Sequence, residues 1–468
     1  MIRRGKRSKS TIAAHEKPYL SLVSQTLEAL AKLRTNEGAW LDSELEHGER
    51  ETLVFKIGEC LRPFYLAAKA YPERFEPDSI LGDALEKDTK LFLQIVEKDR
   101  FFPSPYSQIA DSKDQYTDFA AFVLDLCQLI HHYWSNRRRQ AYLGRGAIKV
   151  AAAALAFLVD PAYHIADDDG CRWAGTSEHT RHRKGKPTEH FTDTFFTSQV
   201  ALSLHGSLGW EVVEVASHRK RVRELVGTAG RWIATRFDGL LTGDEKKSNR
   251  ALLYTTWGLR ALVGTHDCQD VSVRRVIPAI TTAYLKAVKT GLENRELSSQ
   301  EYLTVLSADV DNPLYYEDRT GLGGVLLTMA SLQVLTDPDL ASLLEEASYN
   351  VILERLLNEV YALRGPKTGL WYKDAVILSI HCYLVESFLT LSRGREFGKK
   401  IEVPGHVVRH AVKEALLDET VISTLQQAVY EKILRLNEGR RDEAEFEAAL
   451  RGSHARHPVQ RPRHKGAQ

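Results

Sequence analysis

The sequence lacks several features that would assign it to a familiar class of protein. Its five cysteines form no CxxC pair or other zinc-ligand spacing, which favours reduced thiols in a cytoplasm. No run of about 18 apolar residues occurs, and no apolar segment follows the basic N-terminal residues, so we expect neither a membrane span nor secretion. The net charge is only +1, which excludes nucleic-acid binding by bulk charge and restricts any polyanion site to a local patch.

Nucleotide and hydrolase motifs are absent as well. The chain has no GxxxxGK[ST] phosphate loop, no GxGxxG after a strand, no GxSxG elbow and no HExxH helix. Nucleotide-driven, flavin and zinc-protease chemistries are therefore disfavoured, and we expect no cofactor.

Apolar residues, in contrast, are abundant and recur at helical spacing almost throughout. Hydrophobic residues make up 43% of the chain, and no series of alternating residues indicates a strand. Examples of the helical spacing are residues 21–33, 119–130 and 375–391. The composition and this period predict an all-α globular protein.

A repeat of roughly sixty residues underlies this pattern. An aromatic residue, a short polar step and a long apolar helix recur, with the third residue of each start at 57, 118, 193, 256, 318 and 374. More charged helices are expected between them, at 79–98, 136–159, 215–237, 269–289 and 338–363. Because apolar helices are covered on all sides and amphipathic helices on one, the alternation predicts six inner and six outer helices in two concentric layers.

Gly-aromatic turns and some aromatic pairs precede several of the apolar helices, as in GAW (38–40), GCRW (170–173), PLYY (313–316) and GLWY (369–372). With the period and the segments TDTFFTSQVALSLHG (192–206) and YTTWGLRALV (254–263), they resemble the six-hairpin toroid superfamily over residues 16–395. That superfamily includes glycosidases and lyases, sugar epimerases, terpene cyclases, prenyltransferase β-subunits and lanthionine cyclases. The resemblance implies an (α/α)6 toroid, but does not select one chemistry. Outside the toroid, residues 404–437 and 441–451 are expected to form helices of a C-terminal helical extension.

The chain is expected to divide into four parts. Residues 1–15 and 453–468 are basic and poor in apolar residues, which predicts disordered tails. Residues 16–400 form the expected toroid and residues 401–452 the helical extension.

Acidic residues stand at the starts of four expected inner helices: Asp118, Asp193, Asp318 and Asp374. The resemblance implies that these starts share one rim of a central funnel. As helix N-caps, the carboxylates would accept hydrogen bonds from free backbone N–H groups. Alternatively, some of them point into the funnel, ionised by the helix dipole and suited to act as a general base.

The longest insertion precedes Asp193 and contains three consecutive acids, Asp167 to Asp169. Crowded carboxylates raise one another's pKa, so one of them would serve as general acid while a neighbour stays ionised. A solvated turn before Gly170 is the alternative, and a divalent cation is a third, although the spacing does not match an EF-hand loop. We predict Asp168, Asp169, Asp193 and Asp118 as catalytic residues.

Cationic and aromatic residues gather at the same expected rim. The loop of residues 172–190 is rich in arginine, lysine and histidine, which indicates an anionic partner unless it is simply a solvated loop. Aromatic residues at the helix starts either line the funnel or close the core. The predicted substrate-binding residues are Arg172, Trp173, His190, Asp318, Arg319, Trp371, Tyr372 and Asp374.

Metal-bearing toroids combine Asp, Cys and His, or two Cys and a His, at the cavity. The chain offers His381-Cys382, His266-Asp267-Cys268 and His205-Gly206, which do not reproduce the lanthionine-cyclase arrangement, so we expect no metal. Terpene cyclisation by protonation needs an Asp-x-Asp-Asp acid motif. The nearest match is Asp309-Val310-Asp311-Asn312, whose final asparagine departs from the motif and disfavours that chemistry.

Three functions remain open. The first is an enzyme that acts on a sugar or other polyhydroxylated, in some cases anionic, substrate by carboxylate acid/base chemistry of the glycoside hydrolase, lyase or epimerase type. The second is a non-catalytic scaffold that binds nucleic acid or a partner protein through residues 172–190 and the basic tails. The third is a prenyl or terpene-type enzyme that binds a diphosphate.

Overall fold

The computed structural model describes, apart from a few isolated positions, residues 16–32, 54–72, 83–99, 115–135, 140–175, 192–210, 212–237, 248–294, 321–334, 338–346, 348–365, 370–371 and 378–394. These residues are predominantly helical, which confirms the predicted all-α character. Contacts divide the chain into Met1–Ile401 and Glu402–Gln468. The predicted tails at 1–15 and 453–468 and the predicted extension at 401–452 lie outside the described residues.

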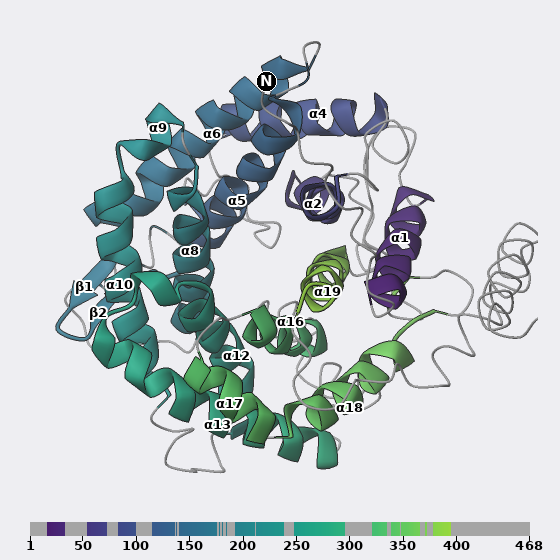
Figure 1. Cartoon of the computed structure of the whole chain (residues 1–468). Coiled ribbons are helices and arrows are strands. Elements are labelled where there is room, and N and C mark those ends of the chain that lie inside the picture. The colour runs from purple at the N-terminus through teal and green to yellow at the C-terminus, as the bar shows by residue number, and fades with distance from the viewer. Residues whose placement is uncertain are drawn as a thin grey trace, which may run out of the picture. The chain divides into compact units, whose positions relative to one another are not determined.

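Six apolar helices make contact with one another in chain order. They are α2 (Val54–Ala70), α5 (Thr117–Trp134), α8 (Thr192–Leu208), α12 (Ser248–Gly264), α16 (Gly321–Val334) and α19 (Leu378–Leu391). Each contacts the next, and α19 contacts α2, so their contacts form a closed circuit (Figure 1). A side chain on one of these helices can therefore meet side chains from helices remote in the sequence.

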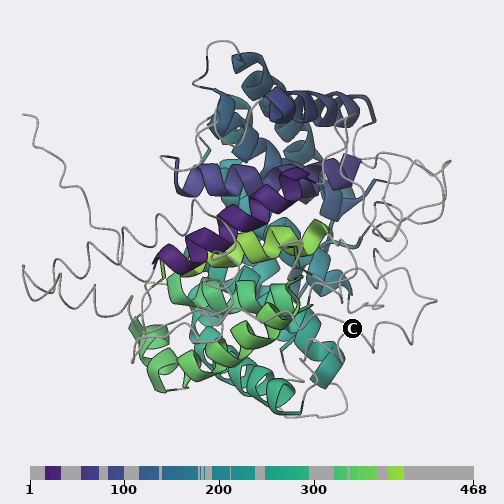
Figure 2. The same cartoon turned by 90° about the vertical axis from the view of Figure 1, so that its right-hand side faces the viewer.

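A second set of helices packs against the first. It consists of α1 (Glu16–Lys32), α4 (Asp83–Asp99), α6 (Ala141–Val159), α10 (Arg219–Thr235), α13 (Val271–Glu293) and α18 (Tyr349–Ala362). Helix α6 contacts α5, α10 contacts α8, α13 contacts α12, and α18 contacts α16. Helix α4 contacts α2, and α1 contacts both α2 and α19 (Figure 2).

The two sets differ in how their side chains are buried. In α10, the buried residues Val222, Leu225, Val226, Ala229 and Trp232 follow one helical stripe, while Arg223 and Glu224 are exposed. In α16, every residue from 322 to 330 is buried. The distinction between amphipathic and wholly apolar helices is thus a difference in the number of covered faces.

Helix boundaries depart from the sequence pattern in two places. Helix α12 begins at Ser248, before the aromatic step expected to start it. The single helix expected over 338–363 is divided into α17 (Pro338–Glu346) and α18, with Ser348 between them in a left-handed conformation at φ 55°. A non-glycine residue in that region interrupts a right-handed helix, and apolar periodicity does not report it.

The sequence pattern also missed a small β-hairpin, formed by β1 (Ile165–Asp167) and β2 (Gly170–Arg172) in antiparallel pairing. Three-residue strands are too short to produce a recognisable alternation of apolar residues. Gly170 adopts φ 142°, and a Cβ there would lie 2.2 Å from the Thr228 carbonyl oxygen of α10. The hairpin therefore lies close against α10 because position 170 has no side chain.

Among the described residues, α6 is the one helix whose length and composition suit a membrane span. Of its apolar window, 56% is buried inside the protein, and the helix contacts α4, α5 and α9 (Val213–Ala216). This packing is that of a core helix.

Candidate functional site

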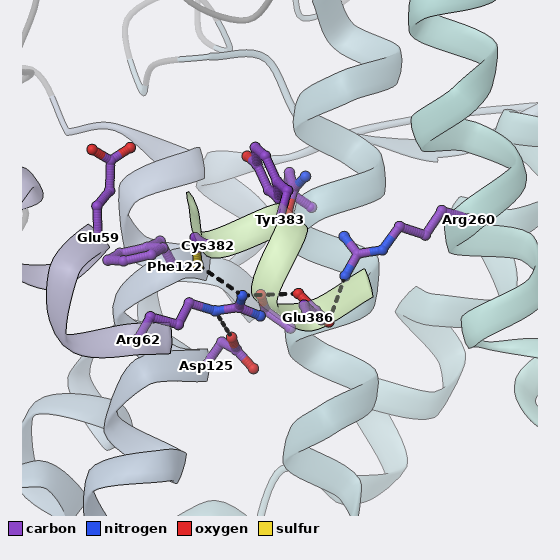
Figure 3. A pocket seen from close by; sticks show the side chains of 10 residues that line it. Glu59, Arg62, Phe122, Asp125, Arg260, Cys382, Tyr383 and Glu386 are labelled. Atoms are coloured by element: carbon purple, nitrogen blue, oxygen red, sulfur yellow. Dashed lines mark hydrogen bonds and ion pairs between the residues drawn. The ribbon is translucent and has the colours of Figure 1, made fainter. Parts of the chain in front are cut away.

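A small polar cavity of about 60 Å³ lies between five of the six apolar helices (Figure 3). Residues of α2, α5, α8, α12 and α19 line it: Glu59, Arg62, Phe122, Asp125, Gln199, Ser203, Arg260, Cys382, Tyr383 and Glu386. Three carboxyl groups and two guanidinium groups thus meet between helices that are otherwise mostly apolar.

The charged groups are joined in one network that links four helices. Arg62 donates from Nε to Asp125 Oδ2 at 2.7 Å and from Nη1 to Glu386 Oε2 at 2.9 Å. The same Nη1 lies 3.2 Å from Cys382 Sγ. Arg260 donates from Nη2 to Glu386 Oε1 at 3.0 Å. Glu386 is consequently held between two guanidinium groups that approach it from opposite sides (Figure 3).

Helical spacing explains why these side chains converge. Glu59 and Arg62 are three residues apart on α2, and Phe122 and Asp125 are three apart on α5. Residues three or four apart share one face of a helix. On α2, α5, α12 and α19, a charged residue therefore lies on the face turned toward the cavity.

The two arginines fix the charge of Glu386. Burial alone would raise its pKa, but the attraction of Arg62 and Arg260 outweighs burial and lowers the pKa to about 2. For Arg62, the attraction of Glu386 and Asp125 outweighs burial and raises the guanidinium pKa well above its ordinary value. The Glu386 carboxylate therefore stays ionised at neutral pH and is a poor proton donor.

Burial also determines the state of the cavity thiol. The pKa of Cys382 is raised to about 11 by burial, although the nearby Arg62 opposes the shift. Because the thiolate is the nucleophilic form of cysteine, Cys382 is unsuited to covalent catalysis at neutral pH.

Aromatic rings adjoin the charged network. Phe122 and Tyr383 line the cavity, and the Tyr383 ring lies 5.0 Å from that of Trp257. Trp257 in turn meets Phe195 edge-on at 5.5 Å, and the Arg260 guanidinium lies 5.5 Å from the Trp257 ring. The site thus combines flat apolar surfaces with hydrogen-bonding groups.

Asp118 lies on the same face of α5 as Phe122 and Asp125, four and seven residues before them. Seven residues of helix correspond to about 10 Å along the axis, toward the start of α5. Asp118 is not the N-cap, which is Tyr116, and its Oδ1 accepts a hydrogen bond from the Phe119 backbone N–H at 2.8 Å. Burial raises its pKa to about 6, against the hydrogen bonds that its carboxyl group accepts, so the folded protein holds the Asp118 proton more tightly than an ordinary aspartate would.

Two other predicted site residues meet outside the cavity lining. Arg172 and Asp193 are both buried, with Arg172 Nε 3.9 Å from Asp193 Oδ2. Arg172 Nη1 also lies 3.9 Å from Asp167 Oδ2, and its guanidinium is 5.8 Å from the Trp232 ring of α10. This ion pair therefore lies where β2, α8 and α10 pack together.

Asp168 and Asp169 lie in the exposed turn between β1 and β2, and neither lines the cavity. Asp167 Oδ1 accepts hydrogen bonds from the backbone N–H groups of Asp169 and Gly170, and Asp169 Oδ2 is 3.2 Å from Arg236 Nη2. These contacts are those of a tight turn beside α10. The catalytic role of the two acids stays a prediction.

The two predicted tryptophans are fully buried. The indole N–H of Trp173 donates to the Leu158 carbonyl oxygen, and that of Trp371 donates to Thr26 Oγ1, both at 3.1 Å. Each indole thus packs as a core aromatic with its polar atom satisfied. The other predicted binding residues lie outside the described residues: His190, Asp318, Arg319, Tyr372 and Asp374.

Sequence reasoning missed Arg62, Asp125, Arg260 and Glu386, although a signal for them exists. Each is a single charge within a short apolar stretch, as in CLRPF (60–64), VLDLC (123–127), GLRAL (258–262) and LVESF (384–388). A charge in a helix that is covered on all sides requires a partner. Complementary charges on separate apolar helices therefore indicate a shared site.

No protein family, curated protein or solved structure matches the chain.

Proposed function

We propose that the helical unit is an (α/α)6 toroid, with the six apolar helices as the inner layer and the amphipathic set as the outer layer. The closed circuit of contacts from α2 through α19 and back to α2 supports this arrangement. The regular pairing of each apolar helix with an amphipathic one supports it further.

We propose that the central cavity belongs to an enzyme that acts on a sugar or another polyhydroxylated substrate by carboxylate acid/base chemistry. One observation carries this proposal: carboxyl, guanidinium and aromatic groups from α2, α5, α12 and α19 meet in one cavity, with Asp118 on the same face of α5. Hydroxyl groups donate to carboxylates and accept from guanidinium groups, so a polyol satisfies both kinds of partner.

The charge distribution favours a neutral substrate over an anionic one. Both arginines are already paired with Glu386, so an acidic substrate group would have to displace that carboxylate. A neutral hydroxyl can instead add to the network without breaking an ion pair. The same reasoning disfavours a diphosphate as the ligand of this cavity.

Asp118 is the group proposed to transfer the proton. Its pKa of about 6 allows both protonation states near neutral pH, as a general acid or base requires. Glu386, ionised and fixed between Arg62 and Arg260, orients the substrate. The cavity beside it has room for only a few water-sized groups, so we propose that the sugar ring itself lies between the cavity and Asp118.

A thermal-shift screen tests the binding step with neutral sugars, uronic acids, sugar phosphates, diphosphates and short nucleic acids at low and moderate salt. We expect a salt-resistant rise in melting temperature with a neutral sugar class. Asp118→Asn should retain this rise and lose turnover of the same sugar, whereas Asp160→Asn, which alters a carboxylate in another turn, should retain both. If Asp118→Asn retained turnover as well as the rise in melting temperature, the assignment of Asp118 as the proton-transferring group would be wrong.

A non-catalytic scaffold is the second candidate. Arg62 already forms ion pairs with Asp125 and Glu386, so these buried charges are compensated without a ligand. This pairing supports the scaffold. A salt-sensitive shift with nucleic acid alone, or no shift with any sugar, would favour the scaffold.

A further inference from the structure

Histidine, aspartate and cysteine side chains meet at the C-terminal ends of two neighbouring apolar helices. His205 lies in the last turn of α8, and Asp267 and Cys268 lie in the 3-10 turn η3 (His266–Cys268) that follows α12. His205 Nε2 is 2.6 Å from Asp267 Oδ1. One possible ligand atom from each of the three residues lies within 4.8 Å of the other two.

Backbone hydrogen bonds and packing hold the turn in place. The Cys268 N–H donates to the Thr265 carbonyl oxygen at 2.9 Å, and the Gln269 N–H donates to that of His266 at 3.2 Å. Helix α10 approaches from the other side, where a Cβ on Gly227 would lie 3.1 Å from the Cys268 carbonyl oxygen. The positions of Asp267 and Cys268 are therefore set by the fold, as a preorganised site requires.

We propose that His205, Asp267 and Cys268 bind a divalent metal ion of the Zn²⁺ type. Imidazole, carboxylate and thiolate are the donors that Zn²⁺ takes, at about 2.0 to 2.3 Å. Ligand atoms of such a site lie roughly 3.5 Å apart. The Cys268 sulfur therefore needs to approach the other two ligand atoms by roughly 1.3 Å at most, since all three lie within 4.8 Å, whereas His205 Nε2 and Asp267 Oδ1, 2.6 Å apart, need to separate by roughly 1 Å. The proposal replaces the sequence-based expectation of no metal.

The proposed metal site is open to solvent. The Asp267 side chain is 73% exposed and that of His205 is 26% exposed, so an ion reaches the three ligands from solvent. The same opening leaves a fourth position for water. A hydrogen-bonded His–Asp pair alone would explain the 2.6 Å contact, but it does not use the thiol of Cys268.

The proposed metal site is separate from the cavity. It lies at the C-terminal ends of α8 and α12, whereas Asp118 lies in the first turn of α5. None of its three residues lines the cavity. The ion would tie the end of α8 to the turn after α12, so the metal site does not rest on the proposed enzymatic function.

Spectroscopic titration of the chelator-treated, full-length protein with Co²⁺ and then Zn²⁺ tests the proposal. We expect one Co²⁺ per chain, with a thiolate-to-metal charge-transfer band that Zn²⁺ removes. Cys268→Ser should abolish the band, and His205→Gln and Asp267→Asn should each weaken Zn²⁺ binding by at least about tenfold. Zn²⁺ should also raise the melting temperature of the wild type and not that of Cys268→Ser.

Histidines elsewhere in the chain provide the matched control. The C-terminal segment contains His454, His457 and His464, which are able to bind metal but supply no thiolate. Their joint replacement by alanine should leave the charge-transfer band and its stoichiometry unchanged. Absence of the band in the wild type, or its survival in Cys268→Ser, would overturn the proposal; if Cys268→Ser does not fold, unchanged Zn²⁺ affinity in the surface variant His205→Gln would do so.

Discussion

Glu386 is the side chain on which the charged network depends, because it accepts hydrogen bonds from both Arg62 and Arg260. Its removal leaves the two guanidinium groups with less compensation in a largely buried position. Breaking a buried ion pair by removing one partner is far more costly than losing an exposed pair.

We expect Glu386→Gln to lower the free energy of unfolding at pH 7 by about 3 kcal/mol, at the low end of the range for buried pairs. The low end applies because 21% of the Glu386 side chain is exposed. Urea denaturation measures the change. The control Glu97→Gln removes the exposed partner of Lys149 and should change stability by less than about 1 kcal/mol. Equal effects of the two substitutions would contradict a stabilising role for the network.

The same variant gives a pH-dependent prediction. The Glu386 pKa is lowered from 4.5 to about 2, so its stabilisation is complete above pH 4.5 and is lost as the pH falls through 2. The stability difference between wild type and Glu386→Gln should therefore be constant from pH 6 to 8 and shrink below 4.5. Urea titrations at successive pH values measure this difference, and a constant difference down to pH 3 would contradict the lowered pKa.

Asp118 should show the opposite dependence. Its pKa is raised from 3.8 to about 6, so the folded protein holds the proton more tightly than the unfolded chain. Stability present below pH 3.8 is then lost as the pH rises through 6. Relative to Asp118→Asn, the wild type should lose up to about 3 kcal/mol across this interval, as measured by urea denaturation. A flat difference would indicate an ordinary pKa.

At the scale of helices, close approach of α2 and α5 brings Arg62 and Asp125 within hydrogen-bonding distance. Gly58 permits this approach, because a Cβ at position 58 would lie 2.6 Å from Cε1 of Phe122 and 3.1 Å from Cε2 of Phe92. A methyl group there must displace an aromatic ring or separate the two helices.

Gly58→Ala should therefore destabilise the protein by about 1 to 3 kcal/mol, despite the better helix propensity of alanine. The matched control is Gly146→Ala on α6, where the new Cβ would meet Leu93 Cδ1 at an ordinary 3.4 Å. That control should be neutral or stabilising by up to about 1 kcal/mol. Thermal unfolding compares the two variants, and a double variant with Phe122→Leu should recover part of the loss at position 58.

At the scale of the helical unit, the beginning and end of the circuit are joined directly. Tyr71 and Ser392 share a hydrogen bond of 2.6 Å between their hydroxyl oxygens, and Arg364 Nη2 donates to Gln25 Oε1 at 2.6 Å. Trp371 reaches Thr26 in the same region. Contacts between residues more than 300 positions apart therefore make the folding of α1 and α2 depend on α19.

A chain that ends at residue 377, and so lacks α19, should lose its cooperative thermal transition. It would expose the faces of α2 and α16 that α19 covers and would remove Glu386 from Arg62 and Arg260. A chain that ends at residue 401 keeps the whole first contact unit and should melt within a few degrees of the full-length protein. Circular dichroism during heating distinguishes the outcomes, and retained cooperativity without α19 would contradict closure.

Much of the helical architecture was predictable because apolar periodicity is a local signal. Helices α5 and α8 begin directly after the aromatic residues at 116 and 191, and α2 begins one residue before the aromatic residue at 55. Helices α10 and α13 fall within or near their expected ranges. The β1–β2 hairpin and the break at Ser348 were not predictable, since three-residue strands and a single left-handed residue leave apolar periodicity unchanged.

The sequence by itself determined most of the division between helices that are apolar on all sides and helices that are apolar on one, because residue spacing indicates which faces of a helix are apolar. Helix α6 is the exception, since its composition suits a membrane span although only 56% of that window is buried. The sequence also placed Asp118 in the first turn of an apolar helix. Only the tertiary structure decided that Arg62, Asp125, Arg260 and Glu386 meet in one cavity. It also decided that Arg172 and Asp193 pair with each other outside the lining of that cavity. The physical reason is that contacts between distant helices, and the pKa values that burial and neighbouring charges impose, depend on distances through space that residue spacing does not contain.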